Sequence, residues 1–88
     1  MVEKPFEILI RPHTSEKSIS LIEKENSIVF IVDRRSNKAQ IKQAFEKAFN
    51  VKIDKVRTTI TRKAEKKAFI KLNKKYSAAD IAVRLGII

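Results

Sequence analysis

The sequence predicts a single α+β domain in which helices pack on a mainly antiparallel sheet of four strands. The chain of 88 residues has room for one hydrophobic core, and apolar residues make up 43% of it, as in a compact globular domain. Short apolar or alternating runs, typical of strands, are interleaved with segments whose apolar residues recur every three or four positions, as in helices. The expected order is strand, helix, strand, helix, strand, strand and helix, with residues 1–88 forming one domain.

The first strand and helix are bounded by residues that stop or cap regular structure. Residues 6–11 are expected to form a short strand that stops at Pro12, because proline lacks the N–H that a sheet ladder needs. Thr14 or Ser15 would then cap a helix that continues to about Glu25. The expected inward stripe of this helix is formed by Ile19 and Ile22, with Leu21 as a further candidate.

The middle of the chain combines a buried strand with an amphipathic helix. Ile28–Val32 is apolar enough to be a central strand. Asn37 with Gln40 resembles a capping box, and Asn50 can adopt the left-handed conformation that ends a helix. The apolar residues of the helix between them lie on one continuous face: Ile41, Ala44, Phe45, Ala48 and Phe49.

The second half of the chain predicts a hairpin followed by a last helix. A third strand should run from Val51 to Thr61, and a fourth from Lys67 to Leu72, joined by residues 62–66. Ser77 would cap the last helix, and Gly86 would end it. The sequence leaves open whether this helix covers the same sheet face as the other two.

The positive charge of the chain is concentrated in one segment. The formal net charge is +10, and residues 55–75 hold nine basic residues against one acid, Glu65. Such segregation is typical of a protein that binds a polyanion. The alternative is a solvated hairpin kept soluble by charge, although mixed signs would serve solubility equally well.

Catalysis is not expected. There is no cysteine, the single histidine is His13, and the single glycine, Gly86, excludes a glycine-rich phosphate loop. The acids are scattered, so we expect no enzyme, no cofactor and no metal. No apolar run approaches the roughly 20 residues that span a bilayer, and no secretory signal is recognisable, so a cytoplasmic protein is expected.

RNA binding is the favoured interpretation. The hairpin should bring cations close together, and threonine hydroxyls beside them can donate to phosphates or to 2′-hydroxyls. Lys38 and Lys42 form a second candidate, and Arg34–Arg35 is either a third or a charged turn. The predicted contacts of the hairpin are Arg57, Thr59, Thr61, Arg62, Lys63, Lys66, Lys67 and Lys71.

Phe69 is an aromatic residue between two cations, Lys67 and Lys71, on the strand face opposite Ala68 and Ile70. It could stack on a splayed base. The structural alternative, which the sequence favours, is that it lies under the last helix.

Residues 10–18, 26–32, 37–58 and 66–72, with the ending from Tyr76, form a series of motifs that covers essentially the whole chain. Together they resemble the universal large-subunit ribosomal protein L23 family, in its archaeal form. Residues 10–18 (IRPHTSEKS) resemble the N-terminal signature of that family, and residues 26–32 (NSIVFIV) resemble its second strand. Residues 37–58 resemble its central helix and third strand. Residues 66–72 (KKAFIKL) resemble the fourth strand, and the ending from Tyr76 resembles archaeal members.

This resemblance implies a structural protein that binds large-subunit rRNA beside the exit tunnel, next to ribosomal protein L29. It also implies a docking site for factors such as the signal recognition particle. Glu16 matches the docking glutamate of the family motif, and its structural alternative is an acid that stabilises a helix start. The connection at residues 62–66 is too short for the tunnel-lining extension of bacterial members. A free-standing RNA chaperone or a small phosphate-ester hydrolase on a similar scaffold remains the alternative.

Overall fold

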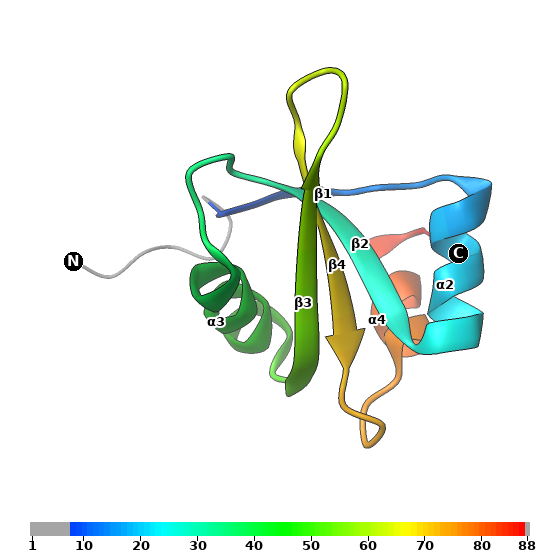
Figure 1. Cartoon of the computed structure of the whole chain (residues 1–88). Helices are drawn as coiled ribbons and strands as arrows, with labels where there is room; N and C mark the ends of the chain where they lie inside the picture. Colours follow the sequence, from blue (N-terminus) through cyan, green and yellow to red (C-terminus); the bar gives the residue numbers. More distant parts are fainter. Residues whose placement is uncertain (1–7, 88) are drawn as a thin grey trace.

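A computed structural model describes residues 8–87 as a four-stranded antiparallel sheet with helices packed against it (Figure 1). The elements follow the predicted order, and the α+β class is confirmed. They are β1 (Leu9–Pro12), α2 (Glu16–Glu25), β2 (Ser27–Val32), α3 (Lys38–Phe49), β3 (Ile53–Ile60), β4 (Lys66–Leu72) and α4 (Ala78–Leu85).

Strand boundaries differ from the prediction by one or two residues. Residues 6 and 7 of the predicted first strand lie outside the described residues. Pro12 is the last residue of β1, opposite Phe30, instead of a residue beyond the strand. Because Pro12 ends an edge strand, its missing N–H disturbs little of the ladder. Val51 precedes β3, which begins at Ile53.

The strands are ordered β1-β2-β4-β3, so β4 lies in the centre although it follows β3 in the chain. The β3–β4 hairpin is in register from Lys55 opposite Lys71 to Ile60 opposite Lys66. Its loop extends beyond the rest of the molecule, at the top of Figure 1. The longest strands of the sheet therefore carry the most basic segment outward.

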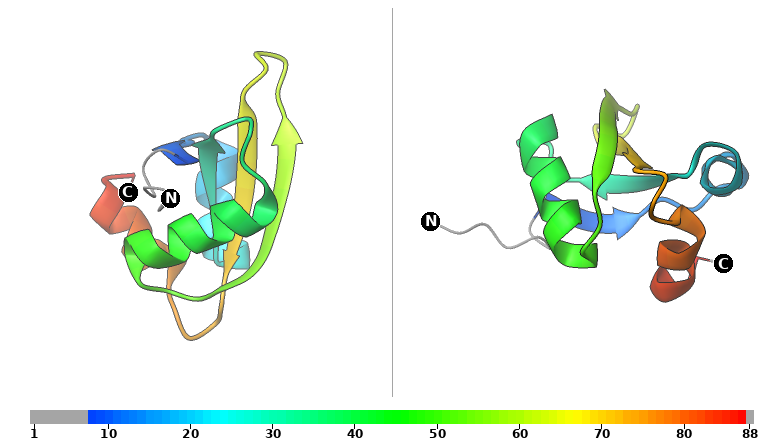
Figure 2. Two further views of the ribbon diagram at one scale, coloured as in Figure 1. Left: turned by 90° about the vertical axis from the view of Figure 1, so that its left-hand side faces the viewer. Right: turned by 90° about the horizontal axis from the view of Figure 1, so that it is seen from below.

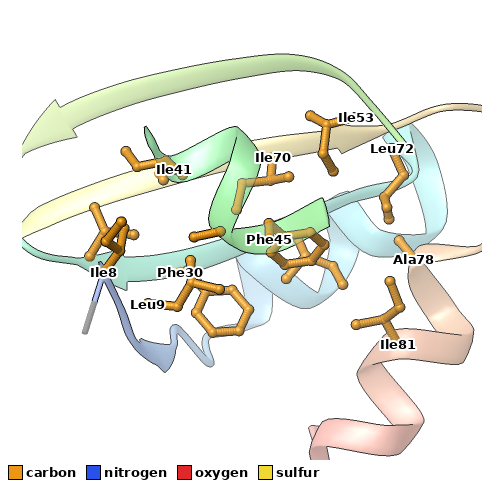
Figure 3. Packing of buried hydrophobic residues seen from close by; sticks show 14 of the residues in the cluster. Ile8, Leu9, Phe30, Ile41, Phe45, Ile53, Ile70, Leu72, Ala78 and Ile81 are labelled. Atoms are coloured by element: carbon orange, nitrogen blue, oxygen red, sulfur yellow. The ribbon is translucent and has the colours of Figure 1, made fainter. Parts of the chain in front are cut away.

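One face of the sheet is covered by the hydrophobic core (Figure 3). Phe45 of α3 is completely buried, and its ring meets Phe30 edge-on at 5.7 Å between centroids. Ile81 of α4 belongs to the same cluster of buried side chains. The last helix therefore covers the same face as α3, which settles the question that the sequence left open.

The position of α2 is different. It packs against β2, which lies between β1 and β4, and stands to one side of α3 and α4 in the view from below (Figure 2, right). Ile22 points into the common core, as predicted, whereas Ile19 is only half-buried. Ser18 is the second buried residue of α2, and its hydroxyl donates to the His13 carbonyl at 2.9 Å.

Helix ends are fixed largely by the residues that the sequence indicated. Ser15 caps α2 and Asn37 caps α3, each in a capping box. Asn50 ends α3 in the left-handed conformation, with φ of 54°. Asn26 does the same for α2, with φ of 53°, and its side chain also reaches the start of α4. The predicted caps are thus confirmed, and Asn26 adds a tertiary link that local patterns do not reveal.

Candidate nucleic-acid interface

The second face of the sheet is covered by neither α3 nor α4. Its β2 residues are buried beside α2, and its β3 and β4 part is strongly basic. We define the open sheet face as the alternate residues of β2, β4 and β3 that point away from the core. These are Ser27, Val29 and Ile31; Lys67, Phe69 and Lys71; and Lys55, Arg57 and Thr59. Strand side chains alternate between faces, which places every second residue of the hairpin on this side.

The centre of the open sheet face is a row of three paired residues, Val29, Phe69 and Arg57. The guanidinium carbon of Arg57 lies over the Phe69 ring, 4.8 Å from its centroid. The ammonium of Lys67 lies 5.8 Å from the same centroid. Both cations are attracted by the negative face of the ring, which restrains them on the sheet.

This arrangement corrects the favoured interpretation of Phe69. The ring does not lie under α4, because Ala68 and Ile70 are the β4 residues that pack against the helices. Phe69 is half-buried on the opposite face, beneath Arg57. The order of the strands and the side on which α4 returns decide this, and neither can be read from the local pattern.

The basic segment is almost free of internal charge compensation. Among residues 8–87 the ion pairs are Arg11–Glu65, at 2.8 Å, and Arg35–Asp33, at 3.6 Å. The single acid of the basic segment is therefore paired with a cation from β1. Within the described residues, none of the nine basic side chains of residues 55–75 forms an ion pair with a carboxylate.

The tip of the hairpin is a compact loop that exposes two cations. The N–H of Thr61 donates to the Glu65 carbonyl at 2.8 Å, and Ala64 adopts a left-handed φ of 61°. The Thr61 hydroxyl oxygen accepts from the Glu65 N–H at 3.3 Å, so this predicted contact shapes the loop. Arg62 and Lys63 are exposed at the tip.

Two groups of predicted cations lie away from the open sheet face. Lys66 is opposite Val32 and Ile60, on the side of the core, and its ammonium donates to the Ser36 carbonyl. Lys38 and Lys42 are exposed on α3, which covers the other face of the sheet (Figure 2). The structure therefore brings together Arg57, Thr59, Lys67 and Lys71, with Arg62 and Lys63 beyond them. Lys66, Lys38 and Lys42 lie elsewhere, and Thr61 lies within the loop.

Lys55 belongs to this surface although it was not among the predicted contacts. It is exposed and pairs with Lys71 across the hairpin. Its position two residues before Arg57 was the signal that could have identified it, since the two share a strand face. An irregularity between Ile53 and Lys55 obscures that register from the sequence.

Glu16 is the first residue of α2, directly after the Ser15 cap, and is exposed. A carboxylate in the first turn interacts favourably with the helix dipole. Its predicted structural role is consistent with this position, and its side chain is also accessible to a partner.

Asp33 and His13 are the described residues with clearly shifted pKa values. The backbone N–H of Arg35 donates to the Asp33 carboxylate at 2.9 Å and lowers the pKa of that carboxyl. The hydrogen bond closes the turn that carries Arg34 and Arg35, which favours the charged-turn interpretation. Burial, reinforced by the positive charges of Lys67 and Arg11, lowers the pKa of His13.

Residues 8–87 lack two features, a cluster of metal-ligating side chains and a helix that could span a bilayer. No three of the histidine and acidic side chains in this range form a cluster suited to a metal ion. None of the helices in the same range is both long enough and apolar enough to span a bilayer.

The geometry defines a class of protein: a small α+β domain with one sheet face buried under helices and the other presenting unpaired cations. The family model of ribosomal protein L23 matches residues 7–85. A curated relative, the large ribosomal subunit protein uL23 of Methanothermobacter thermautotrophicus, is 45% identical over 83 residues, covering 94% of this chain and 96% of the relative. The chain belongs to the ribosomal protein L23 family, as its motifs predicted. This is a family of ribosomal proteins and not of enzymes.

Proposed function

We propose that this protein is a structural component of the large ribosomal subunit in the cytoplasm, and that it binds large-subunit rRNA. The surface assigned to RNA is the open sheet face together with the hairpin tip. The observation that carries the proposal is the one-sided charge: the basic segment has a single acid, and that acid is already paired with Arg11. Phosphates would supply the missing negative charge, so binding an RNA backbone is electrostatically favourable for such a surface.

The chemistry of the surface suits a folded RNA. Arg62 and Lys63 at the tip and Lys67 and Lys71 on the sheet can each neutralise a phosphate, and each such contact releases counterions. Thr59, exposed between these cations, can donate to a phosphate or to a 2′-hydroxyl. The binding should therefore depend steeply on salt and read the RNA mainly by shape.

The variants that test this surface remove equal charge from two places. Changing Arg62, Lys63, Lys67 and Lys71 to Gln should weaken binding to transcribed cognate large-subunit rRNA at least about tenfold, since each lost phosphate contact lowers affinity. Lys66 stays unchanged because its ammonium holds the Ser36 carbonyl. The matched control changes four exposed cations elsewhere to Gln, namely Lys24, Lys47, Lys52 and Arg84.

Equal losses in the two quadruple variants, with both folded, would refute the assignment. A third variant, with Lys38 and Lys42 changed to Gln, asks whether α3 adds a second contact. A small loss there would support the weaker RNA contact expected for these residues, and no loss would remove them from the interface.

The family resemblance suggests where in the ribosome the protein lies and which factors dock on it. We propose that the protein lies beside the exit tunnel, next to ribosomal protein L29, and offers a docking site for factors such as the signal recognition particle. The hairpin loop, residues 61–65, is too short to suggest a tunnel-lining role. Glu16 is the first residue of α2 and is exposed, so its side chain is accessible to a partner.

Two measurements test this role. Glu16→Ala should leave incorporation into large subunits normal and reduce recruitment of the signal recognition particle to ribosomes; failed incorporation would contradict the docking assignment. The protein should also sediment with large subunits through a moderate salt wash. A free-standing RNA chaperone would remain in the soluble fraction instead.

A further inference from the structure

A hollow of about 140 Å³ opens on the sheet face beside the Arg57–Phe69 pair. Its lining residues come from α2 and three strands: Glu25, Ser27, Lys55, Arg57, Phe69 and Lys71. The hollow thus combines an aromatic wall, three cations and one carboxylate within a space comparable to a single nucleobase. We name it the Phe69 hollow.

The contents of the Phe69 hollow argue against a simple anion site. Three cations alone would suit a phosphate, but the exposed Glu25 carboxylate also lines the hollow and repels an anion there. A carboxylate in this position can accept a hydrogen bond from the exocyclic amino group of a base, as carboxylates do in base recognition. The mixture of charges therefore fits a nucleotide, with its phosphates outside and its base within.

Phe69 and the Arg57 guanidinium above it form a flat surface on which a base can stack. Arg57 lies over Phe69 at 4.8 Å, so the ring is partly covered and the guanidinium is restrained on the open sheet face. Arg57 is exposed, which leaves its planar group available to a second flat partner. Unstacked bases are commonly held on aromatic rings or on arginine guanidinium planes. The pair forms a ready-made stacking platform because both parts come from paired strands.

We propose that the Phe69 hollow binds one unpaired nucleotide of an RNA strand. Its base stacks on the Arg57–Phe69 pair, and its flanking phosphates contact Lys55 and Lys71. The inference rests on the proposed RNA-binding function and adds to it a discrete site where base, and not only backbone, is recognised.

The experiment compares two strands that differ only in their bases. One is a ten-nucleotide oligoadenylate, and the other is its abasic analogue, which has the same number of phosphates. Fluorescence anisotropy should show that the full-length protein binds the oligoadenylate at least about fivefold more tightly, because stacking contributes about 1–3 kcal/mol per base. Inorganic tripolyphosphate, added as a competitor, should displace both strands and thus report the phosphate contribution alone.

Variants identify the residues that create the preference for bases. Arg57→Lys keeps the charge but loses the planar group, and Phe69→Leu keeps apolar volume but loses the ring. Both should reduce the preference to less than about twofold while leaving affinity for the abasic strand nearly unchanged. Lys71→Gln is the matched control, which should weaken both strands by a similar factor.

Each outcome bears on the proposal. Equal affinity of the unmodified protein for both strands would overturn the hollow as a base site, even if cognate rRNA still binds. A preference that survives in Arg57→Lys and in Phe69→Leu would also overturn it, provided that circular dichroism shows both variants folded. If the protein binds neither strand and also fails to bind cognate rRNA, the proposed RNA-binding function itself is contradicted.

Discussion

Asn26 links the end of α2 to the start of α4, so its replacement should lower the stability of the fold. It ends α2 in the left-handed conformation, with φ of 53°. Its side-chain amide donates to the Tyr76 carbonyl at 2.9 Å, and its side-chain oxygen accepts from the N–H of Ala78 at 2.7 Å. Ala78 is the first residue of α4, where the backbone N–H has no partner within the helix. One asparagine thus connects the end of α2 with the start of α4.

The expected magnitude follows from these contacts. Two hydrogen bonds contribute about 0.5–1.5 kcal/mol each, and a left-handed alanine costs about 1–2 kcal/mol. Asn26→Ala should therefore lower the free energy of unfolding by about 2–5 kcal/mol. A domain of this size has about 4–13 kcal/mol in total, so the loss should be easily visible. Asn26→Gly should lose the hydrogen bonds but avoid the left-handed strain, and should cost about 1 kcal/mol less.

The assay is urea and thermal unfolding followed by circular dichroism on the unmodified protein and both variants. Asn26→Ala should lower Tm by about 8–40 °C, at about 4–8 °C for each kcal/mol in a domain of this length. The reasoning is refuted if Asn26→Ala stays within about 0.5 kcal/mol of the unmodified protein. It is also refuted if Asn26→Gly proves the less stable of the two.

Three further predictions concern the core, a helix end and pH. Phe45→Ala should cost about 3–5 kcal/mol because the ring is completely buried, and Phe49→Ala clearly less because its ring is half-buried; chemical denaturation measures both. Gly86→Ala should lower the free energy of unfolding by about 1–2 kcal/mol from backbone strain alone, because φ is +74° and no atom lies within 4 Å of the added methyl. Gly86→Asn should lower it less in the same assay, because asparagine tolerates the left-handed conformation better. The pKa of His13 is lowered in the folded state. As pH falls below the ordinary pKa of 6.5, the unfolded chain therefore binds a proton on His13 before the folded chain does. The free energy of unfolding should decline from that pH down to the folded pKa. Urea unfolding at pH 7.5 and 5.5 should show this decline, and an unchanged decline in His13→Gln would contradict it.

The sequence predicted the elements and caps because these depend on neighbouring residues. The capping side chains of Ser15 and Asn37 and the left-handed Asn50 bond or bend within a few positions, so local chemistry determines them. The core face of α3 is equally local, since its apolar residues recur at helical spacing.

The placement of the basic residues was predicted only in part, because it depends on tertiary arrangement. Lys66 and Lys67 are neighbours in sequence, yet one holds the Ser36 carbonyl beside the core and the other lies by Phe69 on the open face. Which face stays open depends on where α3 and α4 return, and that is a property of the whole chain. The Arg57–Phe69 pair likewise requires the hairpin register, which a loop of five residues and an irregularity near Ile53 establish.

The salt dependence of rRNA binding tests the central claim most directly. Affinity of the purified protein for cognate large-subunit rRNA is measured from low to moderate salt, and log K is plotted against log salt concentration. The variant that loses Arg62, Lys63, Lys67 and Lys71 should show a slope shallower by about 3, at about 0.7–0.9 for each phosphate contact, whereas the matched four-charge control should keep the original slope. Parallel lines for all three proteins, or the same flattening in both variants, would contradict the claim that the open sheet face and hairpin tip bind the RNA.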